Sequence, residues 1–102
     1  MYNHTIVVDL DDTLVENKWP ELGDWMPGAV DAMKKLHEAD IHIIVWSCRF
    51  SVVDPYGQLR TYQEVEDDIQ EVRAKFTLAG LGFIHIHEYG WKPSASAYVD
   101  DR

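Results

Sequence analysis

Short apolar runs alternate along this chain with longer segments that have helical spacing. Thr5 to Leu10 and Ile41 to Trp46 are apolar and partly β-branched, which is typical of buried strands. Phe83 to Ile86 and Ala97 to Val99 are shorter runs of the same kind and predict a third and a fourth strand. Because strands alternate with helical segments, the pattern predicts an α/β fold with a mainly parallel sheet.

Two of the intervening segments predict amphipathic helices. The first begins at Pro27-Gly28 and runs to about Ala39, and the second runs from Thr61 to about Ala79. Apolar residues that recur at helical spacing define their inner faces: Val30, Met33 and Leu36 in the first helix, and Val65, Ile69, Val72 and Phe76 in the second.

The remaining segments lack a steady period. Leu14 to Met26 contains Pro20 and Gly23, so we expect a loop or flap at residues 14–27. Arg49 to Arg60 is irregular, with a turn at Asp54-Pro55-Tyr56-Gly57. No repeat or linker interrupts the pattern, and residues 1–102 are predicted to form one domain.

Two carboxylates follow the first strand at a spacing of two residues, in Asp9-Leu10-Asp11-Asp12-Thr13. Like charges held side by side are costly unless a cation or a shared proton compensates. Oxygen ligands favour a hard cation such as Mg²⁺. Taken alone, the motif fits equally well a strand that ends in an acidic turn, because Asp is common in turns.

Further polar residues follow the other predicted strands. Ser47 comes directly after Trp46, and Asp100-Asp101 comes directly after Val99. In parallel sheets, ligands bind outside the carboxyl ends of the strands, near a change in strand order. We therefore expect Asp9, Asp11, Ser47 and Asp100 to converge on one edge of the sheet.

Composition restricts the function in a few respects. The net charge of −9 argues against an electrostatic grip on nucleic acid, although it does not exclude a nucleic-acid end as substrate. A single cysteine, Cys48, rules out an internal disulfide. No apolar stretch is long enough to span a bilayer and the N-terminus has no basic region, so we expect a cytoplasmic protein without a membrane partner.

The order of the polar motifs resembles the haloacid dehalogenase-like (HAD) hydrolase superfamily, whose members are mostly phosphatases. The resemblance spans nearly the whole chain and rests on four motifs in the family's order: Asp9-x-Asp11-x-Thr13, Ser47, Lys92 in Gly90-Trp91-Lys92-Pro93, and Asp100-Asp101. It implies a Rossmann-like core with three α/β/α layers and a mainly parallel sheet of about four to five strands.

The resemblance also implies an Mg²⁺-dependent phosphatase acting on a phosphorylated substrate. Asp9 would be the nucleophile that forms an aspartyl phosphate, and Asp11 the general acid and then the general base. Asp9 and Asp100 would ligate Mg²⁺, with the Asp11 carbonyl oxygen, and Asp101 would ligate it directly or through water. The acid at Asp11 separates phosphatases from relatives that attack carbon.

Other residues receive supporting roles. By the resemblance, Ser47 would donate a hydrogen bond to a phosphoryl oxygen, Lys92 would pair with its charge, and Thr13 would brace the turn after the nucleophile. Arg49 lies two residues past Ser47, so we expect it at the pocket rim as a substrate contact.

The two tryptophans of the flap allow two interpretations. Trp19 and Trp25 could stack on a substrate or seal the edge of a small core. The sequence alone favours neither.

Two features depart from the family. No segment is long enough to hold a cap domain, and capless relatives have open sites that accept macromolecules or are covered by a neighbouring subunit. The chain stops at Arg102, where the family normally continues with another strand or helix. We therefore expect either a minimal version or a fold truncated at its C-terminus.

Alternative functions belong to other classes. A phospho-acceptor receiver domain would also have an early acidic pair and a late Lys-Pro, with Asp54 as acceptor, but Asp100-Asp101 would have no role. A non-catalytic relative that only binds phosphate is a further alternative. His85 and His87 share one face of a strand, but the further ligands that a metal site needs are not evident.

Overall fold

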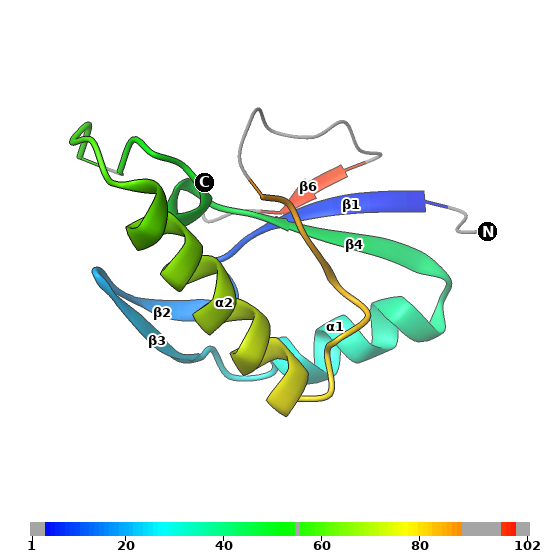
Figure 1. Cartoon of the computed structure of the whole chain (residues 1–102). Helices are drawn as coiled ribbons and strands as arrows, with labels where there is room; N and C mark the ends of the chain where they lie inside the picture. The colour runs from blue at the N-terminus through cyan, green and yellow to red at the C-terminus, as the bar shows by residue number, and fades with distance from the viewer. Residues whose placement is uncertain (1–3, 55, 89–96, 100–102) are drawn as a thin grey trace.

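A computed structural model describes residues 4–54, 56–88 and 97–99 of the chain (Figure 1). Its centre is a four-stranded sheet in the order β5-β4-β1-β6, in which every pairing of neighbours is parallel. The strands are β1 (His4–Asp9), β4 (Ile41–Trp46), β5 (His85–Ile86) and β6 (Ala97–Val99). The predicted α/β class and the mainly parallel sheet are confirmed, although β5 is shorter than the apolar run that predicted it.

Both predicted helices are present, as α1 (Ala29–Glu38) and α2 (Tyr62–Leu78). Thr61 and Glu64 form a capping box at the start of α2, where the Glu64 N–H donates to Thr61 Oγ1 at 3.1 Å and the Thr61 N–H donates to Glu64 Oε1 at 3.2 Å. The Thr61 N–H and the Thr61 hydroxyl, which donates to Glu64 Oε1 at 3.1 Å, lower the pKa of the Glu64 carboxyl group. The helix therefore begins where its sequence supplies partners for its first free N–H groups.

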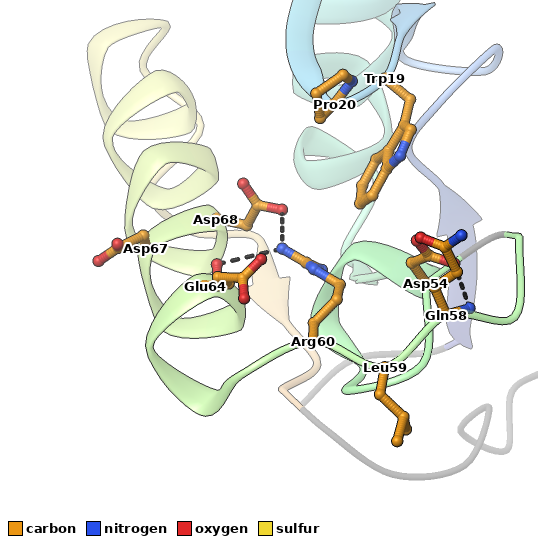
Figure 2. Close-up of a pocket in the computed structure, with 9 residues that line it drawn as sticks. All are labelled: Trp19, Pro20, Asp54, Gln58, Leu59, Arg60, Glu64, Asp67 and Asp68. Atoms are coloured by element: carbon orange, nitrogen blue, oxygen red, sulfur yellow. Dashed lines mark hydrogen bonds and ion pairs between the residues drawn. The ribbon is translucent and has the colours of Figure 1, made fainter.

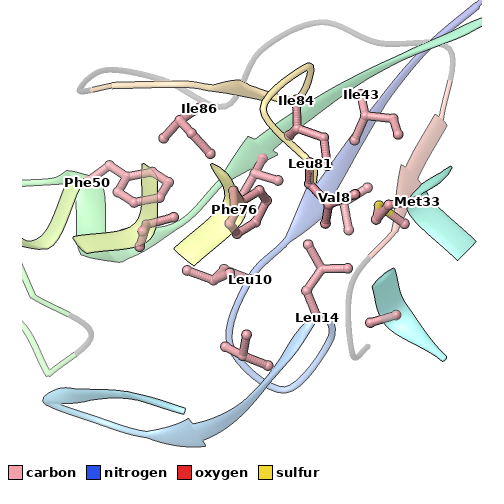
Figure 3. Close-up of a cluster of buried hydrophobic side chains, with 14 of the residues drawn as sticks. Val8, Leu10, Leu14, Met33, Ile43, Phe50, Phe76, Leu81, Ile84 and Ile86 are labelled. Carbon is pink, nitrogen blue, oxygen red and sulfur yellow. The ribbon is translucent and has the colours of Figure 1, made fainter. Parts of the chain in front are cut away.

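One hydrophobic cluster joins both helices to the same face of the sheet (Figure 3). Ile6 and Val8 of β1 and Ile43 and Val45 of β4 alternate along their strands and so share a face, and all four belong to this cluster. Apolar side chains from both helices complete it: Ala29 and Met33 from α1, and Val65, Ile69, Val72 and Phe76 from α2.

This arrangement differs from the three layers that we predicted. The connections from β1 to β4 and from β4 to β5 step across the sheet in the same direction, and right-handed crossovers then place both helices on one face. Within the part of the chain that the structure describes, no helix covers the opposite face. The described residues therefore form two layers.

Residues 14–27, predicted as a loop or flap, contain a β-hairpin. Strands β2 (Val15–Lys18) and β3 (Glu21–Trp25) pair antiparallel as a separate sheet. The sequence did not predict these strands, because Glu16 to Lys18 are all exposed, which leaves no apolar–polar alternation to detect. Gly23 is required here, since a Cβ atom at this position would lie 1.9 Å from the Glu16 carbonyl oxygen.

The strand order changes direction next to β1, since β4 and β6 lie on its two sides. Ligands of open α/β sheets bind at the carboxyl ends of the strands beside such a point. Asp9 is the last residue of β1 and therefore lies there. No helix in the described residues has the length and apolar character needed to cross a membrane.

Candidate active site at the carboxyl ends of the strands

A tight turn follows Asp9 and sets the direction of the next carboxylates. The Leu10 carbonyl oxygen accepts from the N–H groups of Leu14 at 2.9 Å and Val15 at 3.1 Å, and the Asp12 N–H donates to the Val15 carbonyl oxygen at 2.8 Å. Asp12 has a φ of 67°, a left-handed conformation that Asp tolerates better than most residues. The turn thus reverses the chain within a few residues and leads directly into the hairpin.

A cavity of about 180 Å³ lies over this turn. The residues that line it come from the β1 turn, the hairpin and the segment after β4: Asp9, Asp11, Asp12, Asn17, Trp19, Ser47, Cys48 and Tyr56. The predicted meeting of Asp9, Asp11 and Ser47 at one sheet edge is confirmed. It follows from the register, because Asp9 pairs with Trp46 and Ser47 is the next residue along β4.

Ser47 is buried at the start of a short 3₁₀ helix, Cys48–Phe50. Its Oγ accepts a hydrogen bond from the Arg49 N–H at 3.1 Å. This contact uses a lone pair of the hydroxyl oxygen, and the O–H group can still donate. Ser47 therefore has the geometry of a hydrogen-bond donor to an anion in the cavity.

Arg49 does not lie at the pocket rim, so our prediction of a substrate contact was wrong. Its side chain is 1% exposed because the 3₁₀ helix turns it inward beneath the hairpin. Arg49 Nη1 donates to the Pro20 carbonyl oxygen at 3.0 Å, and Nη2 donates to the Glu21 carbonyl oxygen at 2.7 Å. The guanidinium carbon lies 4.9 Å from the centroid of the Trp19 ring. The hairpin tip is thus attached to a buried cation.

The same guanidinium group holds the Asp11 carboxylate. Asp11 Oδ1 accepts from Arg49 Nε at 3.1 Å and from Nη2 at 2.9 Å, whereas Oδ2 accepts from Nε alone at 2.9 Å. An arginine–carboxylate fork of this kind fixes geometry as well as charge. The oxygen with the fewer arginine donors, Oδ2, is the better placed of the two to exchange a proton with a ligand.

Thr13 is placed differently from the cavity-lining residues. Its backbone N–H donates to the Leu10 carbonyl oxygen at 3.3 Å, so the residue takes part in the turn. The Thr13 hydroxyl is buried and has no hydrogen-bond partner among the described residues, and Thr13 is not one of the described residues that line the cavity. The Thr13 backbone takes part in the turn, and the bracing role that the resemblance implies for Thr13 stays a prediction.

Three other predicted site residues, Lys92, Asp100 and Asp101, lie outside the described residues. Strand β6 ends at Val99, and Val99 pairs with Val8, the residue before Asp9. Among the described residues, no group of three acidic, histidine or cysteine side chains is arranged to hold a metal ion. The carboxylates of the cavity nevertheless supply the oxygen donors that Mg²⁺ prefers.

The two flap tryptophans differ in their surroundings. The Trp25 ring lies 5.0 Å from that of Phe76, and Lys75 Nζ lies 5.4 Å from its centroid, so Trp25 seals the edge of the core. Trp19 lines the cavity instead. The core-sealing interpretation therefore holds for Trp25, and stacking of Trp19 on a substrate stays a prediction.

Trp19 also lines a second, larger pocket of about 440 Å³, together with residues of α2 and of the loop before it (Figure 2). Arg60 crosses this pocket, where its Nη2 donates to Asp68 Oδ2 at 2.6 Å and its Nη1 donates to the Arg49 carbonyl oxygen at 2.9 Å. Asp54, Glu64 and Asp67 are also in its wall, so with Asp68 four of its nine lining residues are acidic.

Asp54, the acceptor in the receiver interpretation, lies in a loop rather than at a strand end. Its Oδ1 accepts from the N–H groups of Tyr56 and Gln58, both at 2.8 Å, and thereby organises the turn that the sequence predicted.

The histidines lie elsewhere, at the β5 edge of the sheet. The His85 ring centroid is 6.1 Å from that of His87 and 6.3 Å from that of His42. Desolvation lowers the pKa of His85, and the positive charges of His87, His42 and Arg73 lower it further.

Sequence reasoning did not identify Asn17 and Tyr56 as cavity residues. Neither has a spacing or motif that points to a site, because both reach the cavity only through the folding of the hairpin and of the loop before α2.

No family model and no curated protein matches this chain. One solved structure, that of a conserved protein from Bacteroides thetaiotaomicron, is similar over 97% of this chain and 76% of its own, with 28% identity and a TM-score of 0.63. The likeness supports the α/β fold and leaves the function to be argued from the site.

Proposed function

We propose that this protein is a Mg²⁺-dependent phosphatase of the HAD type, which hydrolyses a phosphate monoester through an aspartyl phosphate on Asp9. One observation carries the proposal. Asp9, Asp11 and Ser47, which are separated in the sequence, line one small cavity at the carboxyl ends of β1 and β4. The strand order around β1 and the hairpin after it are compatible with a Rossmann-like HAD core without a cap.

The reaction proceeds in two steps. In the first, an Asp9 oxygen attacks phosphorus, the bond from phosphorus to the leaving oxygen breaks, and Asp11 donates a proton to that oxygen. In the second, Asp11 takes a proton from water as the water oxygen attacks phosphorus, and the bond to Asp9 breaks to release phosphate and restore both side chains. The Ser47 hydroxyl donates to a phosphoryl oxygen throughout.

The residues that would hold Mg²⁺ are Asp9 and the Asp11 carbonyl group and, by the resemblance, Asp100 and Asp101. When bound, the cation neutralises charge on the phosphoryl oxygens. The described residues fit this assignment, because the Asp9 carboxylate lines the cavity and supplies hard oxygen donors.

The surroundings of the site bear on the leaving group. Between β1 and α1 the chain forms only the turn and the β2–β3 hairpin, so this connection contains no cap domain. The cavity of about 180 Å³ has room for a phosphoryl group, and the larger pocket beyond Trp19 has room for part of a larger alcohol. We therefore expect poor turnover of small generic esters and better turnover of larger phosphorylated substrates.

The test is a phosphate-release assay with Mg²⁺, over alkyl and aryl phosphates and phosphorylated oligonucleotides. Asp9→Asn keeps the shape of the side chain but removes the nucleophile, so turnover should fall by more than about a hundredfold. Asp31→Asn makes the same chemical change on the exposed face of α1 and serves as the matched control.

Two results would contradict the proposal. If Asp9→Asn retains turnover while Asp54→Asn abolishes phosphate incorporation, the receiver interpretation is correct. If the wild-type chain binds phosphate but releases none from any substrate, the protein is a non-catalytic relative. The receiver interpretation has less support at present, because the Asp54 carboxylate is engaged by two backbone N–H groups of its own loop.

A further inference from the structure

Arg49 is a buried cation whose contacts connect two parts of the candidate site. On one side it forms the fork with Asp11, and on the other it donates to the carbonyl oxygens of Pro20 and Glu21 at the hairpin tip. Asp68 Oδ2 lies 4.0 Å from Arg49 Nη1 and is already bound by Arg60 at 2.6 Å. The shortest contacts of Arg49 are therefore those to Asp11 and to the hairpin.

We infer that Arg49 is a positioning residue that fixes the Asp11 carboxylate for proton transfer and makes its orientation depend on the closed position of the hairpin tip. The inference rests on the proposed function, in which Asp11 is the acid and base. Arg49 acts on Asp11 and does not contact the substrate, since its side chain is 1% exposed and its guanidinium N–H groups point to protein oxygens.

The geometry explains why an arginine is needed at this position. Its planar fork presents Nε and Nη2 to Asp11 while Nη1 and Nη2 also reach two backbone carbonyl groups. A lysine carries the same charge but has a single donor atom, and it cannot serve the carboxylate and the hairpin together. Arg49→Lys should therefore keep the buried charge and lose the orientation.

The fork also predicts which Asp11 oxygen acts. Oδ1 accepts two arginine N–H groups and Oδ2 accepts one, so Oδ2 carries the transferred proton. If the hairpin tip moves away with Trp19, Arg49 loses its hydrogen bonds to the Pro20 and Glu21 carbonyl groups. The guanidinium group can then shift, and the geometry of its fork with Asp11 changes. Opening of the tip would then turn off the acid while the larger pocket admits or releases the alcohol.

The first arm of the test compares leaving groups. An aryl phosphate needs little protonation, whereas an alkyl phosphate needs a well-placed acid. Arg49→Lys should slow turnover of the alkyl phosphate by about a hundredfold and that of the aryl phosphate by about tenfold at most. Arg73→Lys is the matched control, because it makes the same change at an arginine that pairs with Glu88 and is not among the described residues that line either pocket. It should leave the alkyl-to-aryl ratio unchanged.

The second arm is a double-mutant cycle. If Arg49 acts only through Asp11, Arg49→Lys should cost less than about twofold in turnover when Asp11→Asn is already present. An equal loss on both substrates, or the same loss in the wild-type and Asp11→Asn backgrounds, would show that Arg49 is merely structural. Thermal melts of each variant show whether it is folded under the assay conditions, so that a loss of turnover is not caused by unfolding.

The third arm does not depend on activity. Asn at position 11 cannot form the charged fork, so Asp11→Asn should release Arg49 and speed amide hydrogen exchange in the hairpin, residues 15–25, by about tenfold. Asp31→Asn should leave this exchange unchanged. If Asp11→Asn does not alter the hairpin, the link is absent and the inference fails. If the hairpin responds but the wild-type chain hydrolyses no phosphate ester, the link exists and the proposed function is what fails.

Discussion

The base and the tip of the β2–β3 hairpin are held by different forces. At the base, Val15 is fully buried and Trp25 packs on Phe76 of α2, so apolar contact fixes the strands. At the tip, Trp19 and the carbonyl groups of Pro20 and Glu21 are held by the buried guanidinium group of Arg49. Loss of a contact at the base should therefore lower stability, and loss of a contact at the tip should mainly alter the site.

The largest effect on stability is expected at the base. Trp25→Ala removes the ring that packs 5.0 Å from Phe76 and should lower the free energy of unfolding by about 2–3 kcal/mol, less than full burial would give because Trp25 is only half-buried. Urea-induced unfolding measures this change. Trp25→Phe should restore most of it, and turnover per folded molecule should stay close to wild type. A Trp25→Ala protein of wild-type stability would show that the base is not part of the core.

A smaller effect on stability is expected at the tip. Trp19→Ala removes the wall between the two pockets and the ring over which Arg49 and Arg60 lie, at 4.9 and 5.1 Å. Each such cation–π contact contributes about 0.5–1 kcal/mol, so the free energy of unfolding should fall by about 1 kcal/mol. Steady-state kinetics should show a KM raised several-fold. If Trp19→Ala destabilises the fold more than Trp25→Ala does, the proposed difference between tip and base is wrong.

The smallest effect on stability is expected outside the hairpin, at the β5 edge of the sheet. This edge serves as a reference region for the comparison of tip and base. Because the pKa of His85 is lowered in the folded state, the unfolded chain binds a proton at His85 more readily than the folded chain does. The folded state therefore keeps its full stability above the unfolded pKa of about 6.5. It loses stability as the pH falls from there through the pKa of His85 in the folded state. In His85→Gln, the melting temperature should fall less on acidification than in the wild-type protein. The difference should be small because His85 is exposed. An identical pH dependence in both proteins would exclude this contribution.

The elements of the fold that could be predicted from the sequence are those with a strong apolar period. The stripe Val65, Ile69, Val72 and Phe76 is entirely buried, and α2 begins next to Thr61 as expected. The hairpin was not predicted because residues 16–18 are exposed on both sides of a two-stranded sheet. Their sequence therefore has no alternation of apolar and polar residues that would indicate a strand.

The residues of the candidate site also fall into two groups: those whose positions could be predicted from the sequence and those whose positions could not. The meeting of Asp9 with Ser47 follows from parallel pairing of two predicted strands and could be derived in advance. The burial of Arg49 could not, because its partners are Asp11, 38 residues away, and hairpin carbonyl groups 28 and 29 residues away. A charged residue in a single sequence is expected at the surface, and only the tertiary partners that neutralise it reveal otherwise.

Detection of the aspartyl phosphate tests the central claim most directly. Asp11→Asn should slow the second step by removing the base, and an aryl phosphate lets the first step proceed without the acid, so the intermediate should accumulate. After acid quenching in the presence of Mg²⁺, mass spectrometry of the digested Asp11→Asn protein should find one phosphoryl group on Asp9, and none when Asp9→Asn is added. Absence of the phosphoryl group, or its presence on Asp54 instead, would contradict the assignment of Asp9 as the nucleophile.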